Sequence, residues 1–198
     1  MRLPLKTLAL CCAQVGAISD PPNCSQPGFR DFVYCDPDAP VDDRILDLVG
    51  RLTPADYPAL LHNENSGLPQ WGVPPLTYGE ALHGALAPCG PPGAPGSTGC
   101  ATSFPTPLAL AASLNRSLWA AVAAAVSTEN RGLHNAGLQA SVVWAPVLNL
   151  FRDPRWGRGL ESPGEDPLVG SEYAAFFING LQGGEDARYL KTPATAKQ

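Results

Sequence analysis

The chain has 198 residues, and 18 acidic side chains against 13 basic ones give it a formal net charge of −5. A negative balance with scattered Lys and Arg argues against a nucleic-acid partner. No apolar run approaches the roughly 20 residues needed to cross a bilayer, which argues against a membrane-spanning role. The length suits one sizeable core, or a large piece of a bigger domain.

The N-terminus, MRLPLKTLALCCAQVGAISDPP, resembles a secretory signal peptide. A basic start at Arg2 and Lys6 precedes a mostly apolar stretch and small residues around Ala17, the order typical of a cleavable signal. We therefore predict a signal peptide over residues 1–17 and a secreted, extracellular protein. The alternative is an N-terminal segment that is frayed or buried.

Cleavage there would leave four of the six cysteines: Cys24, Cys35, Cys89 and Cys100. Four cysteines allow three pairings. The two pairs closest in sequence, Cys24–Cys35 and Cys89–Cys100, each close a loop rich in Pro or Gly, where a crosslink offsets much ordering entropy. We favour these disulfides over the alternative of four reduced, buried thiols. A metal site is not predicted, because no CxxC or HxxxH spacing occurs.

A loop-like N-terminal segment over residues 18–40 precedes the first predicted helix, at about residues 41–52. Its apolar side chains fall on one face, which we expect to be buried. They are Ile45, Leu48, Val49 and Leu52. The segment GVPPLTYGEALHG then predicts a short strand that ends near Glu80.

A long helix is predicted over residues 107–131, with Thr106 as its cap and Gly132 at its end. Its apolar stripe recurs at intervals of four residues and comprises Leu110, Leu114, Leu118, Val122 and Val126. Glu129 falls inside this stripe and needs a partner, for which we predict an arginine of the later charged loop. The sequons Asn23-Cys24-Ser25 and Asn115-Arg116-Ser117 are compatible with secretion. Asn115 lies on the flank of the stripe, however, and we expect no glycan there.

The apolar run SVVWAPVLNL, residues 141–150, predicts a strand buried on both faces. A helix should follow from Pro167, capped by Asp166 and ended by Gly183 and Gly184, and RYLKTPATAKQ should form another strand. Strands separated by helices of this length predict crossover connections and a parallel α/β sheet. Both a barrel and an open doubly wound sheet fit this order.

Between that strand and helix lies a loop dense in charge, FRDPRWGRGLESPGEDP, residues 151–167. Ligands of parallel α/β folds sit at the carboxyl ends of strands, where this loop should bring Arg158 beside Glu80 and Lys197. Such a set can hold several hydroxyl groups by charge-assisted hydrogen bonds, which suits a sugar, and His83 could add a donor.

A purely structural role is the alternative for each of these groups. Glu80 could cap a following helix. The loop arginines could brace the loop by pairing with its own carboxylates, and we expect this for most of them. The arginines are Arg152, Arg155 and Arg158, and the carboxylates are Asp153, Glu161, Glu165 and Asp166.

The same loop closely resembles a signature of glycoside hydrolase family 3, in its β-xylosidase-like branch. Further motifs agree with that family in chain order: FVYCDP, RILDLVGRLT, GEALHG, ATSFPTPLALAASLN, STENRGLHNAG, WAPVLNLFRDPRWGRG and YLKTPATAKQ. The resemblance covers about residues 30–198. A collinear set of this kind is much more specific than one short motif.

The resemblance implies that residues 41–198 form roughly the first half of a (β/α)8 TIM-like barrel. Members are retaining, exo-acting β-glycosidases, in which an Asp nucleophile and a second carboxylic acid act in turn on a terminal sugar. No metal or organic cofactor is implied. By motif position, Glu80, Arg158 and Lys197 would bind hydroxyls of that sugar.

Three departures from the family pattern shape the functional hypothesis. Gln198 stands where the motif has His, and Tyr78-Gly79 replace the more usual Trp-Ser. The family nucleophile belongs to an SD motif on a later strand, so we expect no catalytic residue within this chain. Its partners would be an oligosaccharide or xylan-type glycoside and the missing C-terminal half of the barrel. The terminal sugar stays open between xylose, arabinose and glucose. The alternative function is that of a non-catalytic glycan-binding or regulatory remnant.

Overall fold

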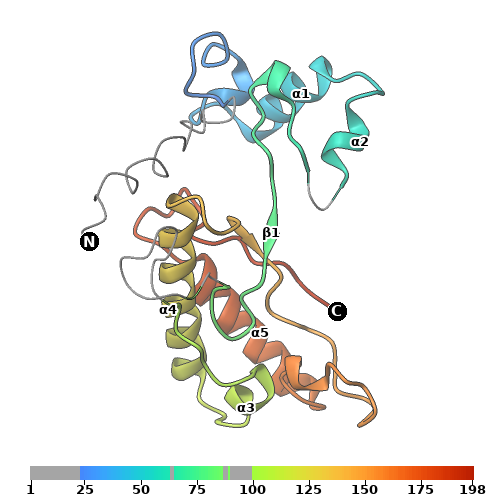
Figure 1. The fold of residues 1–198 in the computed structure, drawn as a ribbon, viewed down its shortest axis with the longest axis vertical. Coiled ribbons are helices and arrows are strands. Elements are labelled where there is room, and N and C mark those ends of the chain that lie inside the picture. Colours follow the sequence, from blue (N-terminus) through green and yellow to red (C-terminus); the bar gives the residue numbers. More distant parts are fainter. Residues whose placement is uncertain (1–22, 63–64, 87–88, 90–99) are drawn as a thin grey trace, which may run out of the picture. The chain divides into compact units, whose positions relative to one another are not determined.

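The computed structural model describes residues 23–62, 65–86, 89 and 100–198. The predicted signal peptide lies outside these residues. The chain divides into two compact units, here called the N-terminal unit (Met1–His62 and Ser66–Pro75) and the C-terminal unit (Asn63–Asn65 and Leu76–Gln198). Figure 1 shows the elements of both. The helix that starts at residue 41 belongs to the N-terminal unit. The start of the barrel portion at residue 41 stays a prediction.

The N-terminal unit contains the 3-10 helices η1 (Val33–Cys35) and η2 (Pro69–Trp71) and the α-helices α1 (Val41–Arg51) and α2 (Tyr57–Leu60). The helix predicted near residues 41–52 is confirmed, but its buried face is not. Ile45 and Val49 are exposed, and α1 contacts η1 through polar side chains instead. Asp47 accepts hydrogen bonds from the backbone N–H of Tyr34 (3.1 Å) and from the guanidinium of Arg51 (2.8 Å).

Aromatic rings and a disulfide complete the N-terminal unit. The guanidinium carbon of Arg51 lies 3.8 Å from the centre of the Phe32 ring, a cation–π geometry. Phe32 also contacts Phe29, Tyr34 and Trp71, with ring centres 5.7 to 6.4 Å apart. The Cys24–Cys35 disulfide closes the segment that carries the Phe29, Phe32 and Tyr34 rings. Polar and aromatic contacts therefore hold this unit together, and α1 has no fully buried residue.

The C-terminal unit is built on a parallel sheet, as the order of strands and helices predicted. Strands β1 (Tyr78–Gly79) and β2 (Val142–Val143) pair in parallel. Parallel bridges from Val143 to Ala194 and from Val147 to Lys197 add the last segment as a third neighbour. The run predicted as one strand over residues 141–150 is regular only at its start, because Pro146 has no N–H to donate to a ladder.

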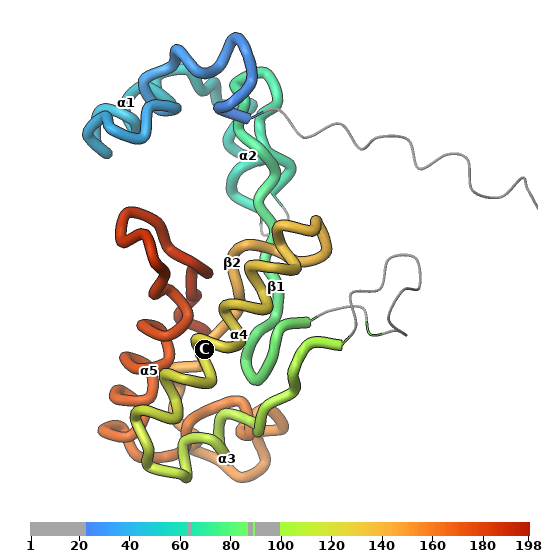
Figure 2. Tube along the Cα trace, turned by 90° about the vertical axis from the view of Figure 1, so that its left-hand side faces the viewer, coloured from blue at the N-terminus to red at the C-terminus, as the bar shows by residue number. Residues whose placement is uncertain are grey.

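Two helices cover one face of this sheet and form the core with it. Helices α4 (Arg116–Asn135) and α5 (Pro167–Gln182) lie side by side, as Figures 1 and 2 both show. Their largest fully buried side chains are Trp119, Val126, Tyr173, Phe177 and Leu181. The predicted limits of α5 are confirmed: Asp166 Oδ1 accepts from the N–H groups of Leu168 (2.8 Å) and Val169 (2.9 Å), and the helix ends before Gly183.

The single helix predicted over residues 107–131 is wrong, because the chain breaks it in two. Helix α3 (Pro107–Ala111) ends, Leu114 takes a left-handed conformation with φ of +51°, and α4 starts after Asn115. The indole N–H of Trp119 donates to the Leu110 carbonyl (2.9 Å) and fixes this turn. The buried stripe of α4 consequently runs through Trp119, one residue away from the predicted Leu118.

Two details of the helix limits also differ from the prediction. Thr106 occupies the cap position of α3 but makes no side-chain capping bond, and α4 continues past Gly132 to Asn135. No helix among the described residues has the length and apolar character that crossing a bilayer requires.

Candidate functional site

The three residues predicted to converge do so in the C-terminal unit. The Lys197 ammonium lies 3.1 Å from both carboxylate oxygens of Glu80. It lies 3.9 Å from Glu161 Oε2, and Arg158 donates two hydrogen bonds to the Glu161 carboxylate, at 3.0 and 2.6 Å. These four side chains, here called the charged network, therefore alternate in sign along one continuous chain of contacts.

Local structure explains why residues 80, 158 and 197 meet. Glu80 directly follows β1, and Lys197 pairs with Val147, beyond the end of β2. The charged loop after β2 supplies Arg158, the residue before the 3-10 helix η3 (Gly159–Glu161). The alternative of Glu80 as a helix cap does not hold, since residues 81–86 form no helix.

The charged loop is held in shape by its own residues. The Phe151 N–H donates to the Gly164 carbonyl (3.0 Å), which joins the two ends of the loop. The Phe151 ring occupies the space that a β-carbon on Gly159 would need, so this position requires glycine. Arg155 pairs with Asp153 (2.6 Å), as the bracing hypothesis predicts. Arg152 instead hydrogen-bonds the Asn149 side chain.

The opposite charges within the network favour the ionised forms of Glu161 and Arg158. The Arg158 hydrogen bonds hold the pKa of the Glu161 carboxyl below its usual range, and the charges of Lys197 and His83 act in the same direction. The same contact raises the pKa of Arg158. The Lys197 side chain is only 14% exposed and Glu161 21%, whereas Glu80 is 47% exposed. Arg158 is 51% exposed, so Glu80 is the more accessible of the two carboxylates and Arg158 the more accessible of the two cations.

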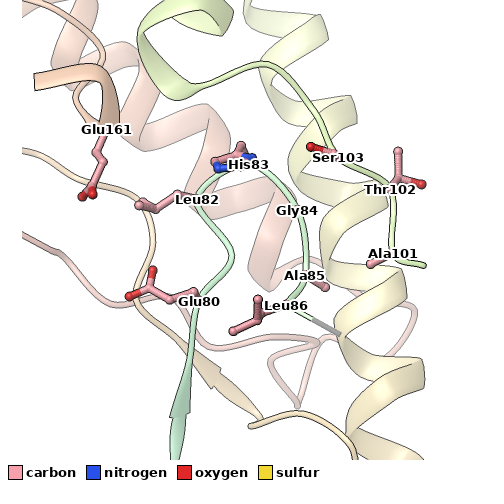
Figure 3. A pocket seen from close by; sticks show the side chains of 10 residues that line it. All are labelled: Glu80, Leu82, His83, Gly84, Ala85, Leu86, Ala101, Thr102, Ser103 and Glu161. Atoms are coloured by element: carbon pink, nitrogen blue, oxygen red, sulfur yellow. The ribbon is translucent and has the colours of Figure 1, made fainter. Parts of the chain in front are cut away.

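A pocket of about 360 Å³ opens beside the network, within the size range of small-molecule sites. Its lining comprises Glu80, Leu82, His83, Gly84, Ala85, Leu86, Ala101, Thr102, Ser103 and Glu161. In Figure 3 the carboxylates of Glu80 and Glu161 lie on one side, and residues 101–103 form the facing wall. Arg158 and Lys197 are not part of the lining but contact its two carboxylates, those of Glu161 and Glu80.

Glu129 helps to hold the facing wall, so the predicted pairing with a loop arginine is wrong. Its carboxylate accepts from the backbone N–H (2.9 Å) and the hydroxyl (2.6 Å) of Thr102. The arginines of the charged loop contact partners two or three residues away and do not reach α4. The Cys89–Cys100 disulfide joins the two wall segments just beyond Leu86 and before Ala101.

Gln139 supports the pocket wall at Leu86 from outside the lining, and the sequence did not point to it. Its side chain donates to the carbonyl of Leu86 (2.7 Å) and accepts from the N–H of Ala140 (2.8 Å). It lies where a β-carbon on Gly79 would be. The one related signal in the sequence was the departure from the family pattern at Gly79. The reason for that departure, the Gln139 side chain beside Gly79, is visible only in the folded structure.

Comparison with known sequences and structures shows which family this chain belongs to. A family described as "Glycosyl hydrolase family 3 N terminal domain" matches residues 92–197, more than half of the chain. The chain belongs to glycosyl hydrolase family 3. The predicted family is therefore confirmed, and the parallel α/β arrangement fits part of the barrel-like N-terminal domain of this family.

Similar family 3 proteins are much longer than this chain. It is 42% identical over 182 residues to "Beta-xylosidase/alpha-L-arabinofuranosidase 2" of Medicago sativa subsp. varia, covering 86% of this chain and 22% of the relative. The corresponding values for "Beta-D-xylosidase 1" of Arabidopsis thaliana are 42%, 85% and 22%. A solved family 3 exo-β-xylosidase, bound to a xylobiose aziridine probe, superposes with a TM-score of 0.78 at 38% identity, covering 89% of this chain and 23% of that one. The chain thus spans about a fifth of the length of such relatives.

Proposed function

We propose that this chain supplies part of the sugar-binding subsite of a retaining, exo-acting β-glycosidase of the β-xylosidase type. In this role Glu80, Arg158 and Lys197 bind hydroxyls of the terminal sugar of an oligosaccharide such as a xylan fragment. The observation that carries the proposal is the charged network beside a pocket of about 360 Å³. The similarity to a solved exo-β-xylosidase supports it.

The network suits a polyhydroxylated ligand for a specific chemical reason. A sugar hydroxyl donates one hydrogen bond and accepts another, so it can bridge a carboxylate and an ammonium. Glu80 and Lys197 offer that pair 3.1 Å apart, with the Glu80 oxygens half-exposed at the pocket. Glu161, itself held by Arg158, lies 3.9 Å from the Lys197 ammonium and helps to hold it, so that less side-chain freedom is lost on binding.

We further propose that the isolated chain does not hydrolyse glycosides. Retaining hydrolysis needs one carboxylate free to attack and another that holds a proton near neutral pH. Glu80 is engaged by Lys197, and the pKa of Glu161 is lowered rather than raised. Neither therefore fits the acid role, and the catalytic carboxylates would come from later strands of a complete barrel.

Nitrophenyl β-xyloside tests this inactivity directly. The purified chain should release no nitrophenol above an Arg158→Ala control. Release that exceeds the control would place the reaction within these 198 residues and contradict the proposal.

The binding role needs a longer version of the protein that carries this segment. Arg158→Ala should lower its kcat/KM by about 10²-fold, as loss of one positioned donor does in other sites. Arg155→Ala is the matched control, because Arg155 is exposed and pairs only with Asp153. An unchanged kcat/KM in the Arg158 variant, relative to that control, would remove Arg158 from the site.

A second candidate function is glycan binding without catalysis, and one observation favours testing it. The residues that line the pocket all belong to the C-terminal unit. In that case the chain would be a monodisperse monomer that binds xylose, which chemical-shift changes at Glu80 and His83 would report. Aggregation without sugar binding would instead favour the role as a portion of a larger barrel.

Secretion is a separate proposal. Two disulfides, Cys24–Cys35 and Cys89–Cys100, are present in the structure. Disulfides persist in oxidising compartments and are rare in the cytosol. Together with the predicted signal at residues 1–17, they support an extracellular protein.

A further inference from the structure

We propose that Asn115 is an N-glycosylation site and that its glycan covers two exposed leucines at the break between α3 and α4. The proposal rests on secretion, as proposed above, and is independent of the pocket. The sequence contains the acceptor motif Asn115-Arg116-Ser117, but a continuous helix would have put Asn115 beside a buried stripe. The break removes that objection, since residues 112–118 are all exposed.

The Asn115 amide is oriented for this modification. Its oxygen accepts a hydrogen bond from the Leu118 N–H (3.0 Å) and caps α4. Its nitrogen has no hydrogen-bond partner among the described residues and, by amide geometry, points away from the capped helix. The oxygen can therefore keep its capping role while the nitrogen carries a sugar.

The glycosylation reaction changes only the amide nitrogen of Asn115. The amide nitrogen forms a bond to the anomeric carbon of a lipid-linked diphosphate oligosaccharide. The lipid diphosphate leaves with the bonding electron pair, and one amide proton is released. The carbonyl oxygen is unchanged, so the helix cap survives.

Neighbouring side chains leave room for the glycan. Arg116, the middle residue of the motif, is held against α5 by Glu172, with contacts of 3.0 and 2.6 Å. At the other motif, the Ser25 hydroxyl donates to the Asn23 side chain (2.6 Å), and Cys24 belongs to a disulfide. The geometry thus favours Asn115 over Asn23.

Two apolar side chains give the glycan a function. Leu114, one residue before Asn115, is 69% exposed, and Leu118, three residues after it, is 42% exposed. Adjacent exposed leucines promote association between molecules, and a bulky, polar glycan attached between them hinders it. Without the sugar, both leucines are exposed to solvent.

Glycan occupancy is tested in secreting eukaryotic cells, with a heterologous cleavable signal so that entry does not depend on residues 1–17. The secreted chain is deglycosylated by an amidase in heavy-oxygen water and analysed by peptide mass spectrometry. More than half of Asn115 should be converted to labelled Asp. Ser117→Ala should abolish the label, whereas Ser171→Ala, an exposed helical serine outside any motif, should leave it unchanged. Unlabelled Asn115 in the folded, secreted chain would overturn the assignment.

The covering role has its own measurement. In the longer protein that carries this segment, Asn115→Asp keeps a capping oxygen but cannot be glycosylated, and it should at least halve the monomeric fraction in size-exclusion chromatography. Adding Leu118→Gln to that variant should restore the monomer. If Asn115→Asp stays as monomeric as the glycosylated chain, the glycan does not cover these leucines. Loss of xylose binding by the pocket would change neither readout, so the two proposals fail separately.

Discussion

The N-terminal unit and the C-terminal unit are stabilised internally by different kinds of contact. In the C-terminal unit, α4 and α5 bury large apolar side chains against each other and the parallel sheet. In the N-terminal unit, α1 buries none of its residues and contacts η1 through Asp47 and Arg44. The C-terminal unit therefore depends mainly on apolar burial, and the N-terminal unit on hydrogen bonds, tilted ring contacts and a disulfide.

This difference shows what an amphipathic pattern can establish. The pattern in α1 is clear, yet Ile45 and Val49 remain exposed while the opposite, polar side makes the intramolecular contacts. The pattern in α5 is no clearer, yet Tyr173 and Phe177 are fully buried. Periodicity identifies a helix and its apolar face, but only a neighbouring element decides whether that face is covered.

The largest expected effect comes from truncating an apolar side chain in each unit and comparing the loss of unfolding free energy. Phe177→Ala removes a fully buried ring stacked 5.3 Å from that of Tyr173, and should lower the free energy of unfolding of the C-terminal unit by about 3–5 kcal/mol. Leu46→Ala, on the exposed side of α1, should change that of the N-terminal unit by less than about 0.5 kcal/mol. Urea unfolding measures both. A loss at Leu46 as large as that at Phe177 would mean that α1 is buried in solution.

The second effect concerns the disulfides, which both join cysteines 11 residues apart. Equal spacing gives each about 3 kcal/mol on the chain-entropy account. Replacing both cysteines of a pair by serine should nevertheless lower the melting temperature of the N-terminal unit more, because that unit has the smaller apolar core. Scanning calorimetry of the two double variants compares them. A larger decrease for the C-terminal unit would contradict the proposed division between the units.

The sequence predicted regular, locally determined features more successfully than tertiary ones. The start of α5 follows from Asp166 and Pro167 alone, because capping is a local interaction. The meeting of Glu80, Arg158 and Lys197 followed from the rule that the ends of parallel strands share one edge. The break between α3 and α4 could not be predicted from a local rule, since it depends on the hydrogen bond from the Trp119 indole to the Leu110 carbonyl.

Two parts of the site were also beyond a reading of the sequence. Glu129 was correctly expected to need a partner, but Thr102, 27 residues away, becomes its neighbour only in the folded chain. Gln139 had no pattern at all. Its side chain occupies the space that a β-carbon on Gly79 would need. This contact joins two segments that are distant in the sequence, so neither segment alone could predict it.

A third, smaller effect asks whether the packed C-terminal unit also depends on a polar tether. Gln139→Ala removes the hydrogen bond to the Leu86 carbonyl and should cost about 1 kcal/mol of unfolding free energy. Gly79→Ala should displace the same side chain, because the new β-carbon meets it. The double variant should therefore lose less than the sum of the two, by about 0.5–1 kcal/mol.

The control for this double-mutant cycle is Gly132→Ala, at an exposed position of α4 where a β-carbon has open space. It should be stabilising by about 0.5–1 kcal/mol and additive with Gln139→Ala. Strict additivity between positions 79 and 139 would instead show that Gln139 does not occupy the space beside Gly79.

The smallest effect compares the paired carboxylates of the two units by their pH dependence. Asp47 and Glu161 both have a pKa lowered chiefly by hydrogen bonds from an arginine, Arg51 and Arg158 respectively. A carboxylate with a lowered folded-state pKa contributes its full stabilisation above the unfolded-state pKa and loses it as the pH falls through the folded-state value. Both contributions should therefore be complete near neutral pH and disappear in acid, Glu161 beginning below its ordinary pKa of 4.5.

Carbon-13 NMR titration of the Glu161 carboxyl tests the order of its partners. Arg158→Ala should move the Glu161 pKa back toward 4.5, and Lys197→Met should move it the same way by less, because Lys197 lies 3.9 Å away and is held by Glu80. Arg155→Ala should leave it unchanged. A larger shift from the Lys197 variant would mean that Lys197 pairs mainly with Glu161 in solution. Glu80 would then be free of its cation, and the hydroxyl-bridging pair on which sugar binding depends would not be preformed.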